Sequence, residues 1–273
     1  MAFSLKLLAR TALRKIGFEP VHTAAALQDV RARDATEIEE LYRRFVFPDL
    51  PKRDYRARCL SGLIGTTISE GVYVLRALHE GLRVPGDICE FGVAQGATSR
   101  LLANEILSLG ERRLWLFDSF EGLPAPTSED KLIDDIFNLG SMERYRGTMA
   151  SREDEVIAKL KGIGFPFDRV RIKKGWVHET IRQTEVPTQV AFAYVDFDFY
   201  QPIKDALEFL DPRMPAGGMI VVDDYDFFSD GAKLAVQEFL AATGQRFTFE
   251  LPLPFAGHFC TLKKVPRPAS VAA

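Results

Sequence analysis

Between Asp87 and Thr243, short apolar stretches alternate along the chain with segments of helical periodicity. The apolar stretches have strand-like lengths and cover residues 87–93, 112–120, 170–176, 189–199 and 217–225. Segments 246–254 and 258–264 have the pattern of a final antiparallel pair. Strands that alternate with helices build a mostly parallel sheet with helices on both faces. The sequence therefore predicts a Rossmann-like α/β fold whose sheet has seven strands.

The part of the chain before this alternation is helical in pattern. Residues 34–45 form one helical segment, and a second region over 55–81 is interrupted near its middle by glycine. We expect a helical N-terminal extension over residues 1–83, the α/β domain over 84–265 and a frayed tail over 266–273.

The composition excludes several classes of protein. Lys and Arg number 35 against 38 Asp and Glu, a net charge of −3, so there is no global basic excess to bind nucleic acid. The three cysteines, Cys59, Cys89 and Cys260, have no zinc-like spacing and favour a reducing compartment. No stretch approaches the ~18 to 20 apolar residues of a membrane span. We therefore expect a cytoplasmic protein.

Residues 2–17 are less neutral than the rest of the chain. On a helix, Leu5 and Leu8 share one face, while Lys6 and Arg10 share another. Such a helix could pack on the body of the protein or rest on an anionic membrane surface. A targeting segment is the third possibility, although basic residues interrupt the apolar core that a signal peptide needs.

Acidic residues stand where the predicted strands end. They are Glu90 in the first strand, Asp118 in the second, Asp196 and Asp198 in the fourth, and Asp223 and Asp224 in the fifth. Acids have poor strand propensity, and ligands of parallel sheets bind at the carboxyl ends of the strands. This recurrence favours a polar or cationic ligand at that edge. The alternative is that each acid caps the following helix.

The first strand ends in a glycine loop, with Gly92 and Gly96 four residues apart. This is not the dinucleotide pattern G-x-G-x-x-G, and Glu90 beside the loop would repel a pyrophosphate. Asp118 after the next strand is placed to accept hydrogen bonds from ribose hydroxyls. S-adenosylmethionine fits, because it carries an ammonium group, a sulfonium and a ribose but no phosphate. The candidate cofactor-binding residues are Glu90, Gly92, Gly96, Thr98, Asp118, Ser119 and Trp176.

Several longer motifs resemble the macrocin O-methyltransferase family of class I, S-adenosylmethionine-dependent enzymes. They are "ICEFGVAQGATS", "LWLFDSFEGLP", "RVRIKKGWVHETI", "VDFDFYQPIKDALEFLDPRMPAGGMIVVDDY" and "AVQEF". The resemblance runs from about Val84 to Lys264 and implies methylation of a sugar or glycoside hydroxyl with the help of magnesium. The segments before Val84 and after Phe249 depart from the family pattern, and such segments commonly shape the acceptor pocket.

Magnesium prefers oxygen ligands, and a divalent cation lowers the pKa of a bound hydroxyl. The resemblance implies that the ligands are Asp196, Asp223 and Asp224. Asp198 is the alternative ligand on the fourth strand, because side chains two residues apart point the same way. Asp196 is favoured over it.

Asp196 could also act as the general base, and His178 and His258 are the alternatives by chemistry. Trp176 could pack on adenine or in the core. The polar insert 124–149 is either a lid over the site or a disordered loop. The rival functions are an NAD-linked oxidoreductase or sugar epimerase and a non-catalytic nucleotide-binding module. A homo-oligomer is a further possibility.

Overall fold

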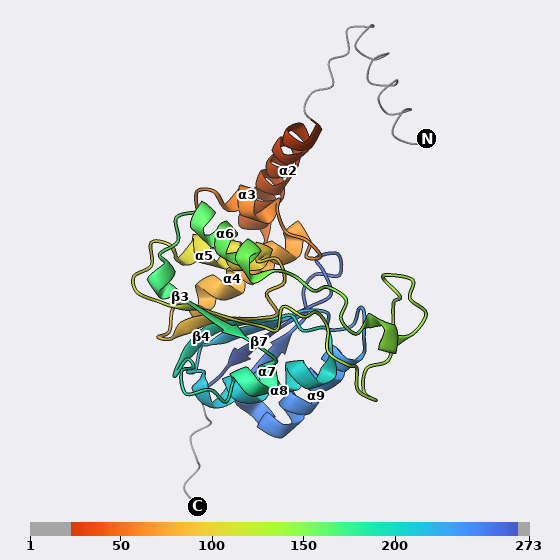
Figure 1. Cartoon of the computed structure of the whole chain (residues 1–273). Helices are drawn as coiled ribbons and strands as arrows, with labels where there is room; N and C mark the ends of the chain where they lie inside the picture. The colour runs from red at the N-terminus through yellow and green to blue at the C-terminus, as the bar shows by residue number, and fades with distance from the viewer. Residues whose placement is uncertain (1–22, 267–273) are drawn as a thin grey trace, which may run out of the picture.

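A single seven-stranded sheet forms the middle of the protein, in the order β3-β2-β1-β4-β5-β7-β6 (Figure 1). We describe it from a computed structural model, which covers residues 23–266. The strands are β1 (Asp87–Phe91), β2 (Leu114–Asp118), β3 (Val170–Lys174), β4 (Val190–Val195), β5 (Met219–Val222), β6 (Phe247–Glu250) and β7 (Cys260–Lys264). Strands β1 to β5 pair in parallel, and β7 runs antiparallel between β5 and β6. The predicted mostly parallel sheet with a final antiparallel pair is confirmed.

Helices cover both faces of this sheet, as predicted (Figure 1). They are α2 (Thr23–Phe45), α3 (Arg56–Leu60), α4 (Ile68–Gly81), α5 (Ala97–Ile106), α6 (Glu153–Gly162), α7 (Val177–Thr180), α8 (Tyr200–Leu210) and α9 (Gly231–Thr243). Helices α2 to α6 lie on one side of the sheet, and α7 to α9 lie on the other.

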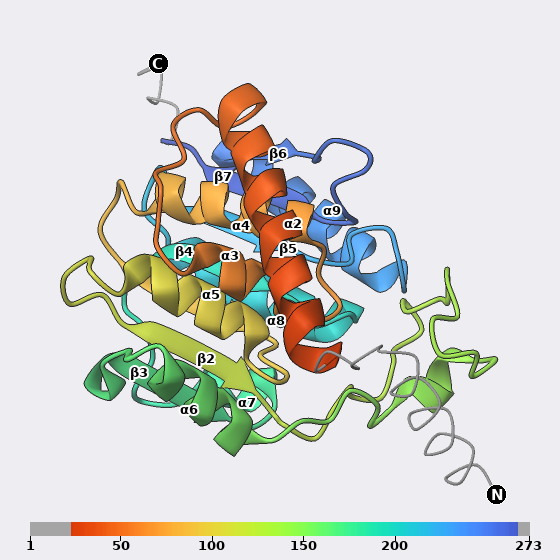
Figure 2. The ribbon, with the colours of Figure 1, turned by 90° about the horizontal axis from the view of Figure 1, so that it is seen from above.

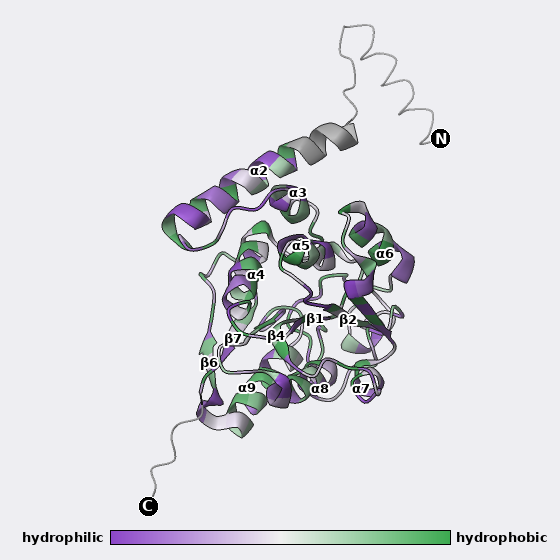
Figure 3. Ribbon diagram, turned by 90° about the vertical axis from the view of Figure 1, so that its left-hand side faces the viewer, coloured by the Kyte–Doolittle hydropathy of each residue, from purple (hydrophilic) through white to green (hydrophobic). Residues whose placement is uncertain are grey.

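Alternate residues of the inner strands pack into two different cores. On β1, Ile88 belongs to the core beneath α4 and α5, whereas Cys89 belongs to the core beneath α8 and α9. On β4, Phe192 and Ala193 divide in the same way. A strand covered on both faces favours apolar residues at every position, which is why β4 is a continuous apolar run and β1 is apolar except at Asp87 and Glu90. Figure 3 shows green and purple on different faces of the helices that cover the sheet.

The N-terminal helices are packed on this body. Helix α4 contacts β4 and β5, and α2 lies over α3 and α4 (Figure 2). A buried ion-pair network joins them to α5, since the Arg56 guanidinium binds Glu39 at 2.7 Å and Glu105 at 2.6 Å. The predicted helical region 55–81 is interrupted as expected, because α3 and α4 are separated at 61–67.

Two expectations concern the ends of the chain. The amphipathic segment 2–17 and most of the tail lie outside the residues that the structure describes. Within the described part, no helix has the length and apolarity that crossing a bilayer requires.

The strand order reverses beside β1, because β1 pairs with β2 on one side and with β4 on the other. The two chain connections there leave the sheet in opposite directions, which opens a crevice at the carboxyl ends of these strands. The acid-rich strand ends found in the sequence therefore lie at one edge of the sheet, around this point.

Candidate active site

The loop after β1 begins and ends with glycines in left-handed backbone conformations. Gly92 has φ 86°, and Gly96, which precedes the first turn of α5, has φ 75°. A Cβ atom on Gly92 would lie 1.7 Å from the backbone oxygen of Asp196, just after β4. No side chain fits in that space, so only glycine lets the loop pass this close to the neighbouring strand end.

Asp118 ends β2 and holds this loop. Its Oδ2 accepts hydrogen bonds from the N–H groups of Val93 and Ala94 at 2.6 and 2.9 Å. Its Oδ1 accepts one from the N–H of Phe120 at 2.6 Å. The sequence indicated a ribose contact and not this support of the loop. Because a carboxylate oxygen has two acceptor sites, Oδ1 can still take a further hydrogen bond.

Glu90 lies beneath the loop with its carboxyl group buried. It is 1% exposed, and its Oε2 accepts a hydrogen bond from the hydroxyl of Ser99 at 2.5 Å. Its Oε1 is buried and has no hydrogen-bond partner among residues 23–266. Burial is the main cause that raises the pKa of Glu90 to about 8, and the nearby Asp118 charge adds to it. Buried polar atoms normally have a hydrogen-bond partner, so Glu90 Oε1 can accept a hydrogen bond from a ligand that carries a cationic N–H group.

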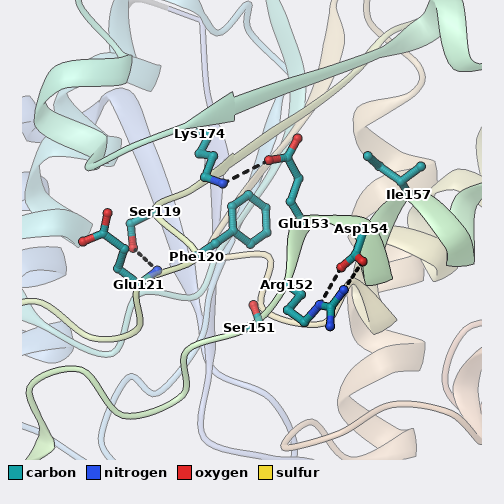
Figure 4. Close-up of a pocket in the computed structure, with 9 residues that line it drawn as sticks. All are labelled: Ser119, Phe120, Glu121, Ser151, Arg152, Glu153, Asp154, Ile157 and Lys174. Atoms are coloured by element: carbon teal, nitrogen blue, oxygen red, sulfur yellow. Dashed lines mark hydrogen bonds and ion pairs between the residues drawn. The ribbon is translucent and has the colours of Figure 1, made fainter.

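A pocket of about 490 Å³ opens where β2 ends, next to Asp118 (Figure 4). Charged side chains surround one aromatic ring in its lining, which consists of Ser119, Phe120, Glu121, Ser151, Arg152, Glu153, Asp154, Ile157 and Lys174. Ser119 is the predicted cofactor residue in this lining. Trp176 stands half-buried at the start of α7, outside the lining, and Thr98 is buried in the first turn of α5.

Three carboxylates meet at the ends of β4 and β5. Asp196, Asp198 and Asp224 each offer an oxygen, and these oxygens lie within 4.8 Å of one another. Asp198 and Asp224 have φ values of 60° and 54°. For residues with a side chain this conformation is strained, and here it directs both carboxylates to the same place.

Burial and mutual repulsion disfavour charge in this acidic cluster of Asp196, Asp198 and Asp224. The pKa values of Asp196 and Asp224 are raised well above the ordinary range. Burial is the largest cause, and the charges of neighbouring carboxylates add to it. Burial likewise raises the pKa of Asp198 to about 6. A bound cation would remove this penalty, so the donor set fits a hard divalent ion such as Mg²⁺.

Asp223, predicted as a ligand, points elsewhere. Its Oδ2 accepts a short hydrogen bond from the Tyr194 hydroxyl, and its Oδ1 accepts one from the N–H of Asp224 at 2.8 Å. The structure thus brings Asp196 and Asp224 together as expected and adds Asp198, whereas Asp223 lies beside this set with both carboxylate oxygens hydrogen-bonded. The ligand set remains a prediction.

Glu70, which comes from α4, is a residue of this region that no sequence pattern indicated. The residue is 4% exposed. Burial, followed by the charge of Asp223, raises its pKa well above the ordinary range. In the sequence, Glu70 follows Thr67 by three residues. This is the spacing of a helix capping box, so the sequence gives no reason to assign Glu70 another role.

The two candidate histidines lie outside the acidic cluster. His178 is exposed on α7. His258 is also exposed, 3.2 Å from Asp226, and its ring stacks on Phe227.

The polar insert 124–149 is ordered and packs against residues next to α8 and α9. Its side chains form a small apolar cluster with residues that flank α8 and α9: Leu123, Met142, Tyr145, Phe199 and Phe228. Asp130 accepts hydrogen bonds from Tyr200 N–H at 2.7 Å and from Ser229 Oγ at 3.3 Å. These contacts contradict the disordered-loop alternative, and movement of the insert as a lid stays a prediction.

A family model described as macrocin-O-methyltransferase (TylF) matches residues 73–248. The chain belongs to this family. The resemblance found from the strand-end motifs is therefore confirmed.

Two proteins of similar sequence are named as O-methyltransferases. The 8-demethyl-8-(2,3-dimethoxy-alpha-L-rhamnosyl)-tetracenomycin-C 4'-O-methyltransferase of Streptomyces olivaceus is 33% identical over 164 residues, which are 59% of this chain and 60% of that protein. The demethyldecarbamoylnovobiocin O-methyltransferase of Streptomyces niveus is 31% identical over 163 residues, with the same coverage. The chain thus spans about 60% of the length of these relatives.

Solved structures share the fold of this macrocin-O-methyltransferase family member. The O-methyltransferase NovP has a TM-score of 0.62 at 24% identity, covering 73% of this chain and 81% of its own. A calicheamicin methyltransferase has a TM-score of 0.57 at 23% identity, covering 84% and 91%. The seven-stranded architecture is therefore that of known methyltransferases.

Proposed function

We propose that the protein is an S-adenosylmethionine-dependent O-methyltransferase that methylates a hydroxyl of a sugar or glycoside with the help of a divalent cation. The observation that carries the proposal is the contact between two sites of different chemistry. A glycine loop above an orphaned buried acid, Glu90, abuts a cluster of three carboxylates. The names of the family and of its relatives support the same reading.

The donor side consists of the glycine loop, Glu90 and the pocket at Asp118. The carboxyl of Glu90 would accept a hydrogen bond from the ammonium group of the cofactor, and Asp118 would accept one from its ribose. The pocket next to Asp118 has room for further parts of the cofactor. A pyrophosphate would meet the buried acid, and this weighs against the NAD-linked alternative.

On the acceptor side, Asp196, Asp198 and Asp224 would hold Mg²⁺. When bound, such an ion lowers the pKa of a hydroxyl that it contacts and helps to position it. We assign the proton of the acceptor hydroxyl to a carboxylate oxygen of Asp196, the base predicted from the sequence. The chain otherwise aligns the donor and the acceptor for a one-step displacement at the methyl carbon. A non-catalytic binding module would not need this acidic cluster.

The test is methyl transfer from S-adenosylmethionine to a panel of glycosides, read as a mass gain of one methyl group. We expect transfer to a glycoside and none to its aglycone. Chelation should abolish the transfer but leave calorimetric binding of S-adenosylhomocysteine intact, because the cofactor is held by other residues. Binding of NAD without binding of S-adenosylhomocysteine would overturn the proposal, and full activity in excess chelator would remove the cation from it.

A further inference from the structure

A second pocket lies on the N-terminal helices. Helix α3 packs between α2 and α5 (Figure 2). A hollow of about 530 Å³ opens between α2 and the chain around the start of α3. Its lining shares no residue with the pocket beside Asp118. We call it the arginine pocket, because its lining includes four arginines: Arg33, Arg53, Arg56 and Arg58.

One of these arginines is neutralised within the protein. Arg56 is fully buried, and its guanidinium donates to both carboxylate oxygens of Glu105, at 2.8 and 2.6 Å. Its Nη1 donates to Glu39 at 2.7 Å. Arg56 therefore joins α2, α3 and α5 through two carboxylates, and it leaves no uncompensated charge for a ligand.

The other three arginines keep their charge. Among the side chains that the structure describes, Arg33, Arg53 and Arg58 have no carboxylate oxygen within 4 Å of a guanidinium nitrogen. Asp54 is the remaining acid of the lining. Like charges that are held around one hollow repel each other, and an anion bound there would offset this repulsion.

Two of the three charged groups are already oriented. Arg53 donates to Ser108 Oγ at 2.7 Å and to the backbone oxygen of Glu105 at 3.0 Å, and neither acceptor cancels its charge. The guanidinium of Arg58 lies 5.7 Å from the centre of the Tyr55 ring. Tyr55 has φ 65°, a strained conformation for a residue with a side chain. Groups that are held in place before binding lose less freedom when a ligand binds.

We propose that the arginine pocket binds a phosphate group. Guanidinium groups match phosphate oxygens with paired hydrogen bonds, and arginine is preferred to lysine where this geometry matters. All the cationic residues of the lining are arginines. The volume lies in the range of small-molecule sites, so the pocket can admit a phosphate with the group that carries it. A soluble phosphate ester and the head group of an anionic phospholipid offer the same chemistry. This site does not depend on the proposed methyl transfer.

The first test is calorimetry of the full chain with pyrophosphate, in a buffer without phosphate or divalent cations. We expect binding, and we expect Arg33→Gln and Arg58→Gln each to weaken it about tenfold, because each removes a charge-assisted donor group. Both residues are exposed, so the variants should fold. Arg44→Gln makes the same change of charge on α2, at an exposed position outside the lining, and should bind like the wild type.

The second test distinguishes the sources of the phosphate by flotation with vesicles that contain phosphatidylglycerol. If the ligand is a lipid head group, substitution of both Arg33 and Arg58 by Gln should reduce flotation, whereas the Arg44→Gln variant should float like the wild type. If the ligand is a soluble phosphate compound, flotation should be unchanged while pyrophosphate binding still requires both arginines. The proposal is overturned if neither assay responds to the two substitutions, or if Arg44→Gln causes an equal loss.

Discussion

Replacing Glu90 by Gln should make the cofactor-free protein more stable and its cofactor site weaker. The buried carboxyl has a pKa of about 8 in the folded protein, against an ordinary value of 4.5. The unfolded chain therefore releases this proton as the pH rises above about 4.5, while the folded chain retains it until about pH 8. The stability that the protonated group contributes at acid pH is lost across that window.

The magnitude follows from these two pKa values. At pH 7 the difference in proton binding amounts to about 3 kcal/mol of lost stability relative to acid pH. The amide of the Glu90→Gln variant would not titrate, but one of its hydrogens would face the place where Glu90 Oε1 has no partner. An unsatisfied donor costs about 1 kcal/mol, so the variant should gain about 2 kcal/mol at pH 7. The two stability curves should cross at about pH 5.

Urea unfolding of the cofactor-free protein measures the stability of the wild type and of Glu90→Gln. The range is about pH 4.5 to pH 8, because these are the pKa values of Glu90 in the unfolded and the folded chain. Calorimetry with S-adenosylhomocysteine should show affinity reduced about ten- to a hundredfold, because a charge-assisted hydrogen bond is lost. Glu111→Gln, at an exposed position, is the control and should leave both measurements unchanged. Parallel stability curves for the wild type and Glu90→Gln would refute the reasoning, as would undiminished binding.

Two further predictions concern the site, and a third concerns the N-terminal segment. Asp198→Asn should raise the Mg²⁺ requirement for thermal stabilisation more than Asp223→Asn, and the reverse order would restore the ligand set first predicted from the sequence. Asp118→Ala should weaken S-adenosylhomocysteine binding by about 1.5 to 3 kcal/mol in calorimetry, since the loop loses its carboxylate anchor; an unchanged affinity would contradict the loop's role. Removing residues 2–17 should reduce flotation with anionic vesicles, where each basic residue contributes about 1 kcal/mol. Equal flotation of the full and shortened chains would exclude this segment as an anchor.

The parts of the site that follow from backbone geometry could be predicted from the sequence. Gly92 and Gly96 occupy conformations that favour glycine, and acids at the ends of parallel strands must share one edge of the sheet. The order of strands and helices was likewise readable, because a sheet covered on both faces requires apolar runs.

What the sequence could not provide depends on side-chain direction and on contacts between distant segments. Asp223 and Asp224 are adjacent, yet Asp223 is hydrogen-bonded to Tyr194 while Asp224 belongs to the acidic cluster, and the left-handed backbone of Asp224 is indicated by no sequence pattern. Glu70, whose pKa is raised by burial and by the charge of Asp223, belongs to a helix that comes before the first strand of the sheet, far from β5 along the chain. Its spacing from Thr67 has a sufficient local explanation as a helix start.

The contact between Gly92 and the backbone oxygen of Asp196 has a consequence for how such a protein can change its acceptor. At Gly92 the donor loop passes so close to the backbone of Asp196, the first acid of the acceptor side, that no side chain fits between them. The separation across which a methyl group would travel is therefore inherited from the sheet, and no substitution of a surrounding side chain resets it. If the proposed methyl transfer takes place here, the side chains around the acidic cluster can change without altering this separation. The acceptor that is bound can then change while the distance between donor and acceptor stays the same.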